Sequence, residues 1–300
     1  MRLTDYVRTV RVRGRASDRA RARRKPTVAF VLSGGGVLGA AQVGQMQALI
    51  DAGIRPDVLV STSVGALNAA AVAADPTPEG AARLAEVWRA LKTEDIFPGS
   101  RVARAWNIVS RGDHIHPNTG IRRLVENLHA ATFEETEIPV WISATNLRTG
   151  EEHWFSSGSL MRAILASTAL PGIFPPVAID GELYIDGGVV NNVPISQAIS
   201  LGAKRIYVLT CGTATGGQRP IRRPLDVLVQ AFAHSRRARV PQDLIQYADR
   251  AEIVMMPTFD PGYIGYNDPS QSARLIERAR SMSAEFLAAP RGVEAAGANA

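Results

Sequence analysis

Residues Val58–Ala70 constrain the fold of this chain most, because an apolar run, a small polar turn and an Ala-rich helical pattern follow one another without a gap. A strand that reverses into a helix within three or four residues strains the residue at the apex and lifts its side chain clear of both elements. Ser63 occupies that apex, where a nucleophilic hydroxyl would lie. Gly65 is the small residue that the close strand–helix contact needs, whereas Ser61 stands where the usual G-x-S-x-G pattern has glycine.

The same serines allow a second interpretation. Serine and threonine side chains commonly accept hydrogen bonds from the first amides of a helix, and such caps stabilise its amino end. Ser61, Thr62 and Ser63 all precede the helical pattern closely enough to act in this way. The stretch by itself therefore leaves the cap and the nucleophile as alternatives.

A glycine-rich turn precedes this stretch. Thr27–Ser33 is an apolar run of strand length, as expected for a strand covered on both faces, and Gly34–Gly39 follows it directly. A helical pattern from Ala41 to Ile50 then stops at Gly53, before the run that starts at Val58. Strand, glycine turn, helix and strand form a βαβ unit, so we expect an α/β fold with a mainly parallel central sheet.

The rest of the chain continues this alternation. Asp180-Gly181 lies between two short apolar runs and is a strong hairpin signal. We find no internal repeat and no clean linker, and therefore predict a single domain over residues 26–289 with a flexible tail at 290–300. Further strands are expected at Val140–Ala144, His153–Phe155, Val177–Ile179, Leu183–Ile185, Ile206–Thr210 and Ile253–Met256, and helices within 78–127, at 160–169, at 225–239 and from about 271 to 289.

Composition excludes several classes of protein. The 300 residues are 46% hydrophobic and 21% charged, which is typical of a globular protein with a sizeable core. No apolar run reaches the roughly 18 residues of a membrane span, and no signal-peptide pattern follows the amino terminus, so we expect a cytoplasmic protein. Cys211 is the single cysteine, which excludes an internal disulfide and a closed cysteine metal site; we interpret it as a small buried hydrophobe.

The net charge of +6 comes entirely from the amino terminus. Residues 1–25 carry ten Arg and Lys against two Asp, a net charge of +8, and the other 275 residues carry 24 basic against 26 acidic side chains. We expect a flexible basic arm, either simply solvated or in peripheral contact with an anionic membrane surface. No platform of interleaved aromatic and basic residues accompanies it, so a specific nucleic-acid partner is not expected.

The glycine-rich turn fits more than one kind of site. Gly34, Gly36 and Gly39 match the G-x-G-x-x-G pattern of dinucleotide-binding proteins. Such a site needs an acidic residue at the end of the second strand to hold the ribose, but Asp57 precedes that strand. An oxyanion hole needs only free backbone amides beside the nucleophile, and parallel neighbouring strands bring both turns to one edge of the sheet. We favour the oxyanion hole because it uses both motifs.

No histidine stands in a context typical of a catalytic base. His114 and His116 fall in a polar loop, and the other three, His129, His153 and His234, stand alone. The base of a serine nucleophile can instead be a carboxylate. Asp186-Gly187-Gly188 follows an apolar strand at a point where no hairpin partner comes next, which leaves a role beyond an ordinary turn open.

Four segments follow one another along the chain and carry a family resemblance. They are Gly-Gly-Gly-Val-Leu-Gly, Ser-Thr-Ser-Val-Gly, Ala-Ser-Thr-Ala-Leu-Pro-Gly-Ile-Phe-Pro-Pro-Val and Tyr-Ile-Asp-Gly-Gly-Val-Val-Asn-Asn-Val-Pro. Together they resemble the patatin-like phospholipase family over about residues 27–210. The resemblance implies a three-layer α/β/α sandwich and a lipid acyl hydrolase that acts on phospholipids or other fatty-acyl esters. It implies a Ser-Asp dyad and neither cofactor nor metal.

Carried over position by position, the resemblance makes Ser63 the nucleophile, Asp186 its base, and the amides of Gly34, Gly35 and Gly36 the oxyanion hole. The remaining motif glycines are Gly39, Gly65, Gly187 and Gly188. The chain departs from the family pattern in two places, because Ser61 replaces the first elbow glycine and Leu38 replaces a basic residue in the glycine run.

Two alternatives to an active hydrolase remain. One is a catalytically weak or inactive patatin-like module that binds a lipid or a protein partner, in which Asp186 merely ties its turn through hydrogen bonds to nearby amides. The other, more remote, is a Rossmann-type nucleotide-binding protein.

Overall fold

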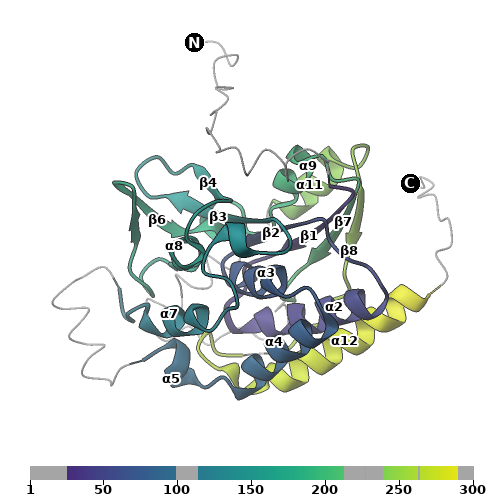
Figure 1. Ribbon diagram of the computed structural model, residues 1–300, viewed down its shortest axis with the longest axis horizontal. Helices are drawn as coiled ribbons and strands as arrows, with labels where there is room; N and C mark the ends of the chain where they lie inside the picture. Colours follow the sequence, from purple (N-terminus) through teal and green to yellow (C-terminus); the bar gives the residue numbers. More distant parts are fainter. Residues whose placement is uncertain (1–25, 99–113, 213–226, 228–238, 263, 290–300) are drawn as a thin grey trace, which may run out of the picture.

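The computed structural model describes residues 26–98, 114–212, 227, 239–262 and 264–289, and one mixed sheet runs through them (Figure 1). The basic arm, the carboxyl-terminal tail and nearly all of the helix expected at 225–239 lie outside the described residues. The strands are β1 (Val28–Leu32), β2 (Val58–Thr62), β3 (Val140–Asn146), β4 (Glu152–Phe155), β5 (Val177–Ile179), β6 (Glu182–Asp186), β7 (Arg205–Leu209) and β8 (Glu252–Met255).

The helices lie between these strands, where the apolar periodicity changes from strand-like to helical. They are α2 (Ala40–Asp51), α3 (Val64–Ala74), α4 (Pro78–Ala90), α5 (Thr93–Ile96), α7 (Thr119–Glu126), α8 (Leu160–Ser167), α9 (Ile195–Ser200), α11 (Val240–Gln246) and α12 (Ser272–Ala288). Short 3-10 turns occupy Gly36–Gly39 and Gly187–Val189, and both belong to the predicted motifs.

The sheet is parallel on one side and antiparallel on the other. β3, β2, β1, β7 and β8 are neighbours in that order and all pair in parallel, which confirms the prediction from the βαβ pattern. β4 and β6 pair antiparallel with β3, and β5 pairs antiparallel with β6. Asp180 and Gly181 join β5 to β6 with φ angles of 52° and 86°, the positive values of a tight hairpin turn.

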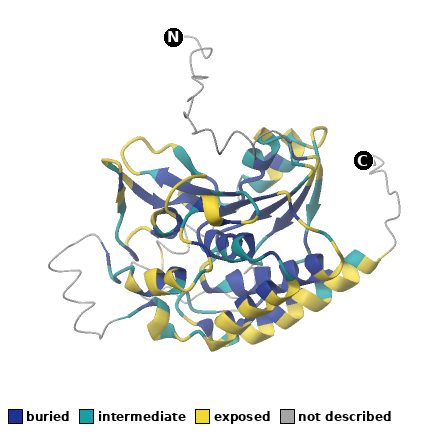
Figure 2. Ribbon diagram, in the orientation of Figure 1, coloured by how far each residue is buried: buried dark blue, intermediate teal, exposed yellow. Residues whose placement is uncertain are grey.

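Side chains of β1 alternate between two apolar cores, one on each face of the sheet. Phe30 and Leu32 pack into the larger core with α2, α3, α4 and α12, whereas Ala29 and Val31 pack into a smaller core with α9 and α11. Figure 1 shows these two helical layers on opposite sides of the sheet, and Figure 2 shows the buried residues concentrated in the strands and the inward helix faces. The protein is therefore a three-layer α/β/α sandwich, as expected.

None of the described helices combines the length and the apolarity that a membrane span requires.

The larger layer depends on a close contact between α2 and α12, which run side by side (Figure 1). Gly44 of α2 lies directly against the backbone of Ile276 and Arg280 in α12, and a Cβ atom at position 44 would collide with both. Nearby, Arg280 forms an exposed ion pair with Asp51 at 2.8 Å. The two helices thus share one tightly packed backbone contact and one solvent-exposed ion pair.

We predict opposite sensitivities at these two contacts. Gly44→Ala should lower the free energy of unfolding by about 1–3 kcal/mol, because overpacking outweighs the roughly 1 kcal/mol that alanine gains over glycine within a helix. Asp51→Ala should change it by at most about 1 kcal/mol, since exposed ion pairs contribute little. Urea unfolding followed by circular dichroism measures both. A more stable Gly44→Ala variant would show that the helices are not in close contact.

Candidate active site

The carboxyl ends of β2 and β6 meet on the same edge of β3. Ile142 and Ser143 of β3 pair with β2 on one side and β4 on the other, and the next two residues, Ala144 and Thr145, pair with β6 and β4. Because β4 occupies one edge throughout, β2 and β6 must share the opposite edge and run toward each other. Thr62 pairs with Ser143 and Asp186 with Ala144, so the ends of the two strands are on consecutive residues of β3.

Ser63 lies at a sharp turn between β2 and α3. Its φ and ψ angles are 56° and −127°, values that a non-glycine residue rarely adopts and that cost on the order of 1–3 kcal/mol. Its N–H donates to Ser167 Oγ at 2.8 Å, which holds the turn from the side of α8. Gly65, the second residue of α3, lies so close to β1 that a Cβ atom would be 2.6 Å from the Leu32 carbonyl oxygen. The elbow predicted from the sequence is therefore present.

The side chains of Ser63 and Asp186 form a short hydrogen bond. Ser63 Oγ lies 2.6 Å from Asp186 Oδ2, and both residues are buried. The other carboxylate oxygen, Oδ1, accepts the N–H of Gly188 at 2.7 Å, while the Asp186 carbonyl accepts the Thr145 hydroxyl at 3.1 Å. Asp186 is thus held from three directions with one oxygen aimed at Ser63. Within the described part of the chain, Asp186 is the hydrogen-bond partner of the Ser63 hydroxyl.

The hydroxyls of Ser61, Thr62 and Ser63 do not cap α3, so that interpretation is wrong. Ser63 precedes α3 without a hydrogen bond from its side chain to the helix. Ser61 and Thr62 belong to β2; Ser61 Oγ donates to the Trp141 carbonyl at 3.2 Å, and Thr62 Oγ1 donates to the Asn191 carbonyl at 3.0 Å. The bond to Trp141 also shows how serine fits where an elbow glycine is usual, because its buried hydroxyl is satisfied within the sheet.

The glycine run lies beside Ser63. A Cβ atom on Gly34 would be 3.0 Å from Ser63 Cβ, one on Gly35 would collide with Cys211, and one on Gly39 would meet Val64 in α3. Glycine is thus required by close packing on both sides of the run. Leu38, where the family pattern has a basic residue, packs against the larger core.

The three predicted oxyanion donors differ in their hydrogen bonds. The N–H of Gly34 donates to the Asn192 carbonyl at 3.2 Å. The amides of Gly35 and Gly36 donate to no acceptor among the described residues. They precede α2 at its amino end, where the helix dipole favours negative charge. Of the three predicted oxyanion donors, these two are therefore the amides without an acceptor in the described part of the chain.

The glycines after Asp186 shape the turn that aims its carboxylate. A Cβ atom on Gly187 would collide with Ser143 in β3, so this turn approaches the strand more closely than any other residue permits. Gly188 provides the N–H that holds Asp186 Oδ1. Gly187 thus permits the close approach to β3, and Gly188 holds the carboxylate of Asp186.

Sequence reasoning missed several polar residues that support the site. Ser167 and Asn192 both lie inside the family segments, but their partners, Ser63 and Gly34, are far away in the sequence. Ser143 Oγ lies 2.7 Å from Thr62 Oγ1 and has no sequence signal at all, because it looks like any small residue in a strand.

The Ser63 hydroxyl bonds to Asp186 and, among the described residues, to no histidine. His114 and His116 are buried, contrary to the expectation of a polar loop, because His116 packs against the rings of Phe97 and Phe174. Asp57 accepts the amides of Thr27 and Val28 at the opposite, amino end of the strands, which argues against a ribose-binding role. His153 packs against two aromatic rings, His129 is exposed, and His234 lies outside the described residues.

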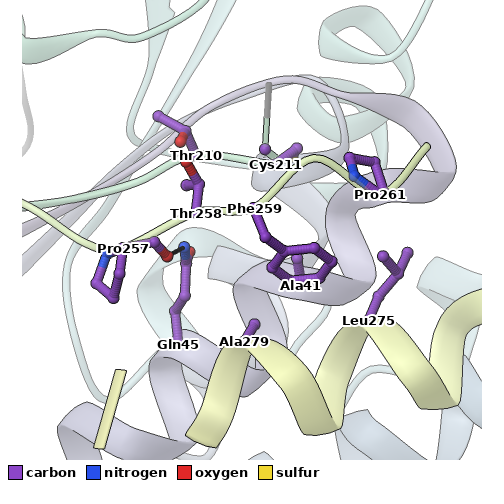
Figure 3. Close-up of a pocket in the computed structure, with 11 residues that line it drawn as sticks. Ala41, Gln45, Thr210, Cys211, Pro257, Thr258, Phe259, Pro261, Leu275 and Ala279 are labelled. Atoms are coloured by element: carbon purple, nitrogen blue, oxygen red, sulfur yellow. Dashed lines mark hydrogen bonds between the residues drawn. The ribbon is translucent and has the colours of Figure 1, made fainter. Parts of the chain in front are cut away.

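A small hollow lies next to the glycine run, where Gly35 packs against Cys211. The residues that line it include Gln45, Cys211 and Phe259 (Figure 3). Neither Ser63 nor Asp186 contributes to it, and it has no interior space for a water molecule. We therefore place the candidate active site at the Ser63–Asp186 edge and not in this hollow. Cys211 is buried there, as the sequence indicates.

Comparison with known proteins gives consistent matches. A family model described as Patatin-like phospholipase matches residues 30–199. Lysophospholipase NTE1 of Mycosarcoma maydis is 29% identical in a 211-residue alignment that covers 66% of this chain and 10% of that protein. Patatin-like phospholipase domain-containing protein 7 of Rattus norvegicus is 31% identical over 189 residues, 62% of this chain and 14% of that protein.

Among solved structures, VipD from Legionella pneumophila aligns with a TM-score of 0.47 and 14% identity over 88% of this chain and 67% of its own. The present chain spans only a small part of the length of the curated relatives, 10% and 14% in the two cases above. The family model covers more than half of the 300 residues and includes Ser63 and Asp186, and the chain therefore belongs to the patatin-like phospholipase family.

Proposed function

We propose that this chain is a lipid acyl hydrolase in which Ser63 is the nucleophile and Asp186 is its general base. The observation that carries the proposal is the 2.6 Å contact between Ser63 Oγ and Asp186 Oδ2 at a strained elbow. Beside it are the amides of Gly35 and Gly36, which donate to no acceptor among the described residues. Proton transfer needs donor and acceptor within roughly 2.6–3.2 Å, and this contact satisfies that condition without a histidine.

In the acylation step, Ser63 Oγ attacks the carbonyl carbon of the ester as its proton passes to Asp186 Oδ2. The carbonyl oxygen becomes an oxyanion, which the amides of Gly35 and Gly36 stabilise. The C–O bond of the leaving alcohol then breaks, and Asp186 returns the proton to that alcohol. The product is an acyl-enzyme on Ser63 and a free alcohol.

In the deacylation step, water attacks the acyl carbonyl while Asp186 accepts one of its protons. The Ser63 oxygen leaves and recovers that proton, and the fatty acid is released. Gly188 and Thr145 keep Asp186 in place throughout, because their hydrogen bonds use the oxygens that do not face Ser63.

Fatty-acyl esters, phospholipids among them, are the substrates that we propose. Support comes from family membership and from relatives whose names include lysophospholipase and phospholipase. Ser61 in place of the elbow glycine is also compatible with an inactive module that binds a lipid or a protein partner. Direct measurement of activity distinguishes the two.

Ser63 should be the site of covalent labelling. A fluorophosphonate probe should add one phosphonyl group to the wild-type protein, because the activated hydroxyl attacks phosphorus as it would an acyl carbonyl, and Ser63→Ala should abolish labelling. Ser61→Ala is the matched control, since it removes a hydroxyl two residues away that points to Trp141. Intact-mass analysis with peptide mapping measures the result. Folded wild-type protein that fails to label would favour the inactive binding module.

Asp186→Asn should reduce kcat for p-nitrophenyl butyrate by about 10²–10⁴-fold, the usual contribution of positioned proton transfer. The amide oxygen can still accept the Gly188 N–H, so the melting temperature should stay nearly unchanged. If Asp186 only ties its turn, activity should instead follow the amount of folded protein. Single His→Ala variants serve as controls. A variant that is folded but inactive would show that a histidine takes part in catalysis and that the site is a triad.

The basic arm should increase binding to anionic bilayers. With a net charge of +8 over residues 1–25 and about 1 kcal/mol for each basic residue near an acidic surface, a few engaged arginines suffice. Co-sedimentation with phosphatidylserine vesicles should be stronger for the full chain than for a variant that begins at Pro26, and salt should weaken it. Equal binding of the two proteins would leave the arm merely solvated, and DNA binding lost on truncation would point to nucleic acid.

A further inference from the structure

Residues 187–192, which we call the 187–192 loop, follow Asp186 directly and contact the elbow of the nucleophile. The N–H of Asn191 donates to the Gly187 carbonyl at 2.9 Å, which closes the loop on itself. The carbonyl of Asn191 accepts the Thr62 hydroxyl at 3.0 Å, one residue before Ser63. The loop therefore joins the two strands that carry the dyad.

The same loop also holds the glycine run. Asn192 accepts the Gly34 N–H with its carbonyl at 3.2 Å and donates from Nδ2 to the Gly34 carbonyl at 3.3 Å. Gly34 in turn packs against Ser63. A shift of this loop would thus move the base, the nucleophile and the proposed oxyanion amides relative to one another.

The side chain of Asn191 anchors the loop to the far edge of β3. It is 1% exposed, and its Nδ2 donates to Glu152 Oε1 at 2.8 Å and to Ser196 Oγ at 3.1 Å. Glu152 belongs to β4, the strand that pairs with β3 on the edge opposite β2 and β6. Arg239 reaches the Val190 carbonyl at 3.5 Å from the smaller helical layer.

Partial burial of Glu152 disfavours the charged form of its carboxyl group. Burial raises its pKa, and the nearby carboxylate of Asp243 acts in the same direction, while the Asn191 hydrogen bond and the charge of Arg239 lower it. A partly buried carboxyl that takes no part in the proposed chemistry needs another reason to be there. Its contact with Asn191 supplies one.

We infer that Glu152 is a positioning residue, which fixes the 187–192 loop by accepting the Asn191 amide and so keeps Asp186 and the glycine run at their distances from Ser63. This inference rests on the proposed function for its catalytic consequence. Its structural part, the order of the loop, can be measured without turnover.

Glu152→Ala should lower kcat for p-nitrophenyl butyrate by about 10-fold with KM nearly unchanged, because a small misplacement of reacting groups slows chemistry more than binding. Glu152→Gln keeps the acceptor oxygen and should restore most of the rate. Glu182→Ala is the matched control, since Glu182 accepts the Asn146 side chain at 3.0 Å in a similar Asn–Glu pair that does not touch the loop. It should leave kcat unchanged.

A second pair of variants tests the contact itself. Asn191→Asp should bring two carboxyl groups together and lower kcat at least as much as Glu152→Ala. Adding Glu152→Gln to Asn191→Asp reverses donor and acceptor and should recover part of the rate. Absence of any recovery, or equal losses in Glu152→Gln and Glu152→Ala, would overturn the inference.

Hydrogen–deuterium exchange on the full-length protein separates this inference from the proposed function. Glu152→Ala should speed exchange about fivefold or more in peptides that cover 186–193, while β1 and β7 stay unchanged. Unchanged exchange in 186–193, or uniform acceleration over the whole sheet, would refute the positioning role. If the wild-type protein neither labels nor hydrolyses ester but Glu152→Ala still shows the local acceleration, the proposed hydrolase is refuted and the role of Glu152 in ordering the loop stands.

Discussion

The site depends on the way two strands end on one edge of β3. β2 runs parallel to β3 and stops opposite Ser143, and β6 runs antiparallel and stops opposite Ala144, so their last residues face each other. Neither strand can continue, because the other occupies its path. Each chain must turn out of the sheet at that point, and the side chains of Ser63 and Asp186 meet there at 2.6 Å. The strain at Ser63 is a direct consequence of this sharp exit.

Small residues and short polar side chains make this meeting possible. Gly65 and Gly187 let the two turns approach the neighbouring strands to distances that a Cβ atom forbids. Around them, the hydroxyls of Thr62, Ser143 and Ser167 form hydrogen bonds that satisfy polar groups buried in the sheet. A network of this kind is rigid, since each member is fixed by a partner on a different element, and rigidity is what the proposed Ser63–Asp186 dyad would need.

Patterns within short segments allowed most of the fold to be predicted. Apolar runs covered on both faces gave the parallel strands, and the Asp180-Gly181 pair gave the β5–β6 turn at its observed place. The two histidines at 114 and 116 were misjudged because a polar neighbourhood in sequence does not exclude burial against Phe97 and Phe174 from other segments. The cap interpretation failed for the same reason, since the partners of Ser61 and Thr62 lie on β3 and on the loop after β6.

The sequence by itself determined the strands and most of the described helices, though not α9 and α11. It also determined the elbow at Ser63, the glycine run and the family segments that point to Asp186, because each of these depends on residues close together in the chain. Only the tertiary structure decided that Ser63 and Asp186 touch across 123 positions, and that Glu152 reaches Asn191 across 39. It also distinguished Gly34, already bonded to Asn192, from the neighbouring amides of Gly35 and Gly36. Such contacts are set by strand register and by the packing of distant segments, and a local pattern carries no record of either.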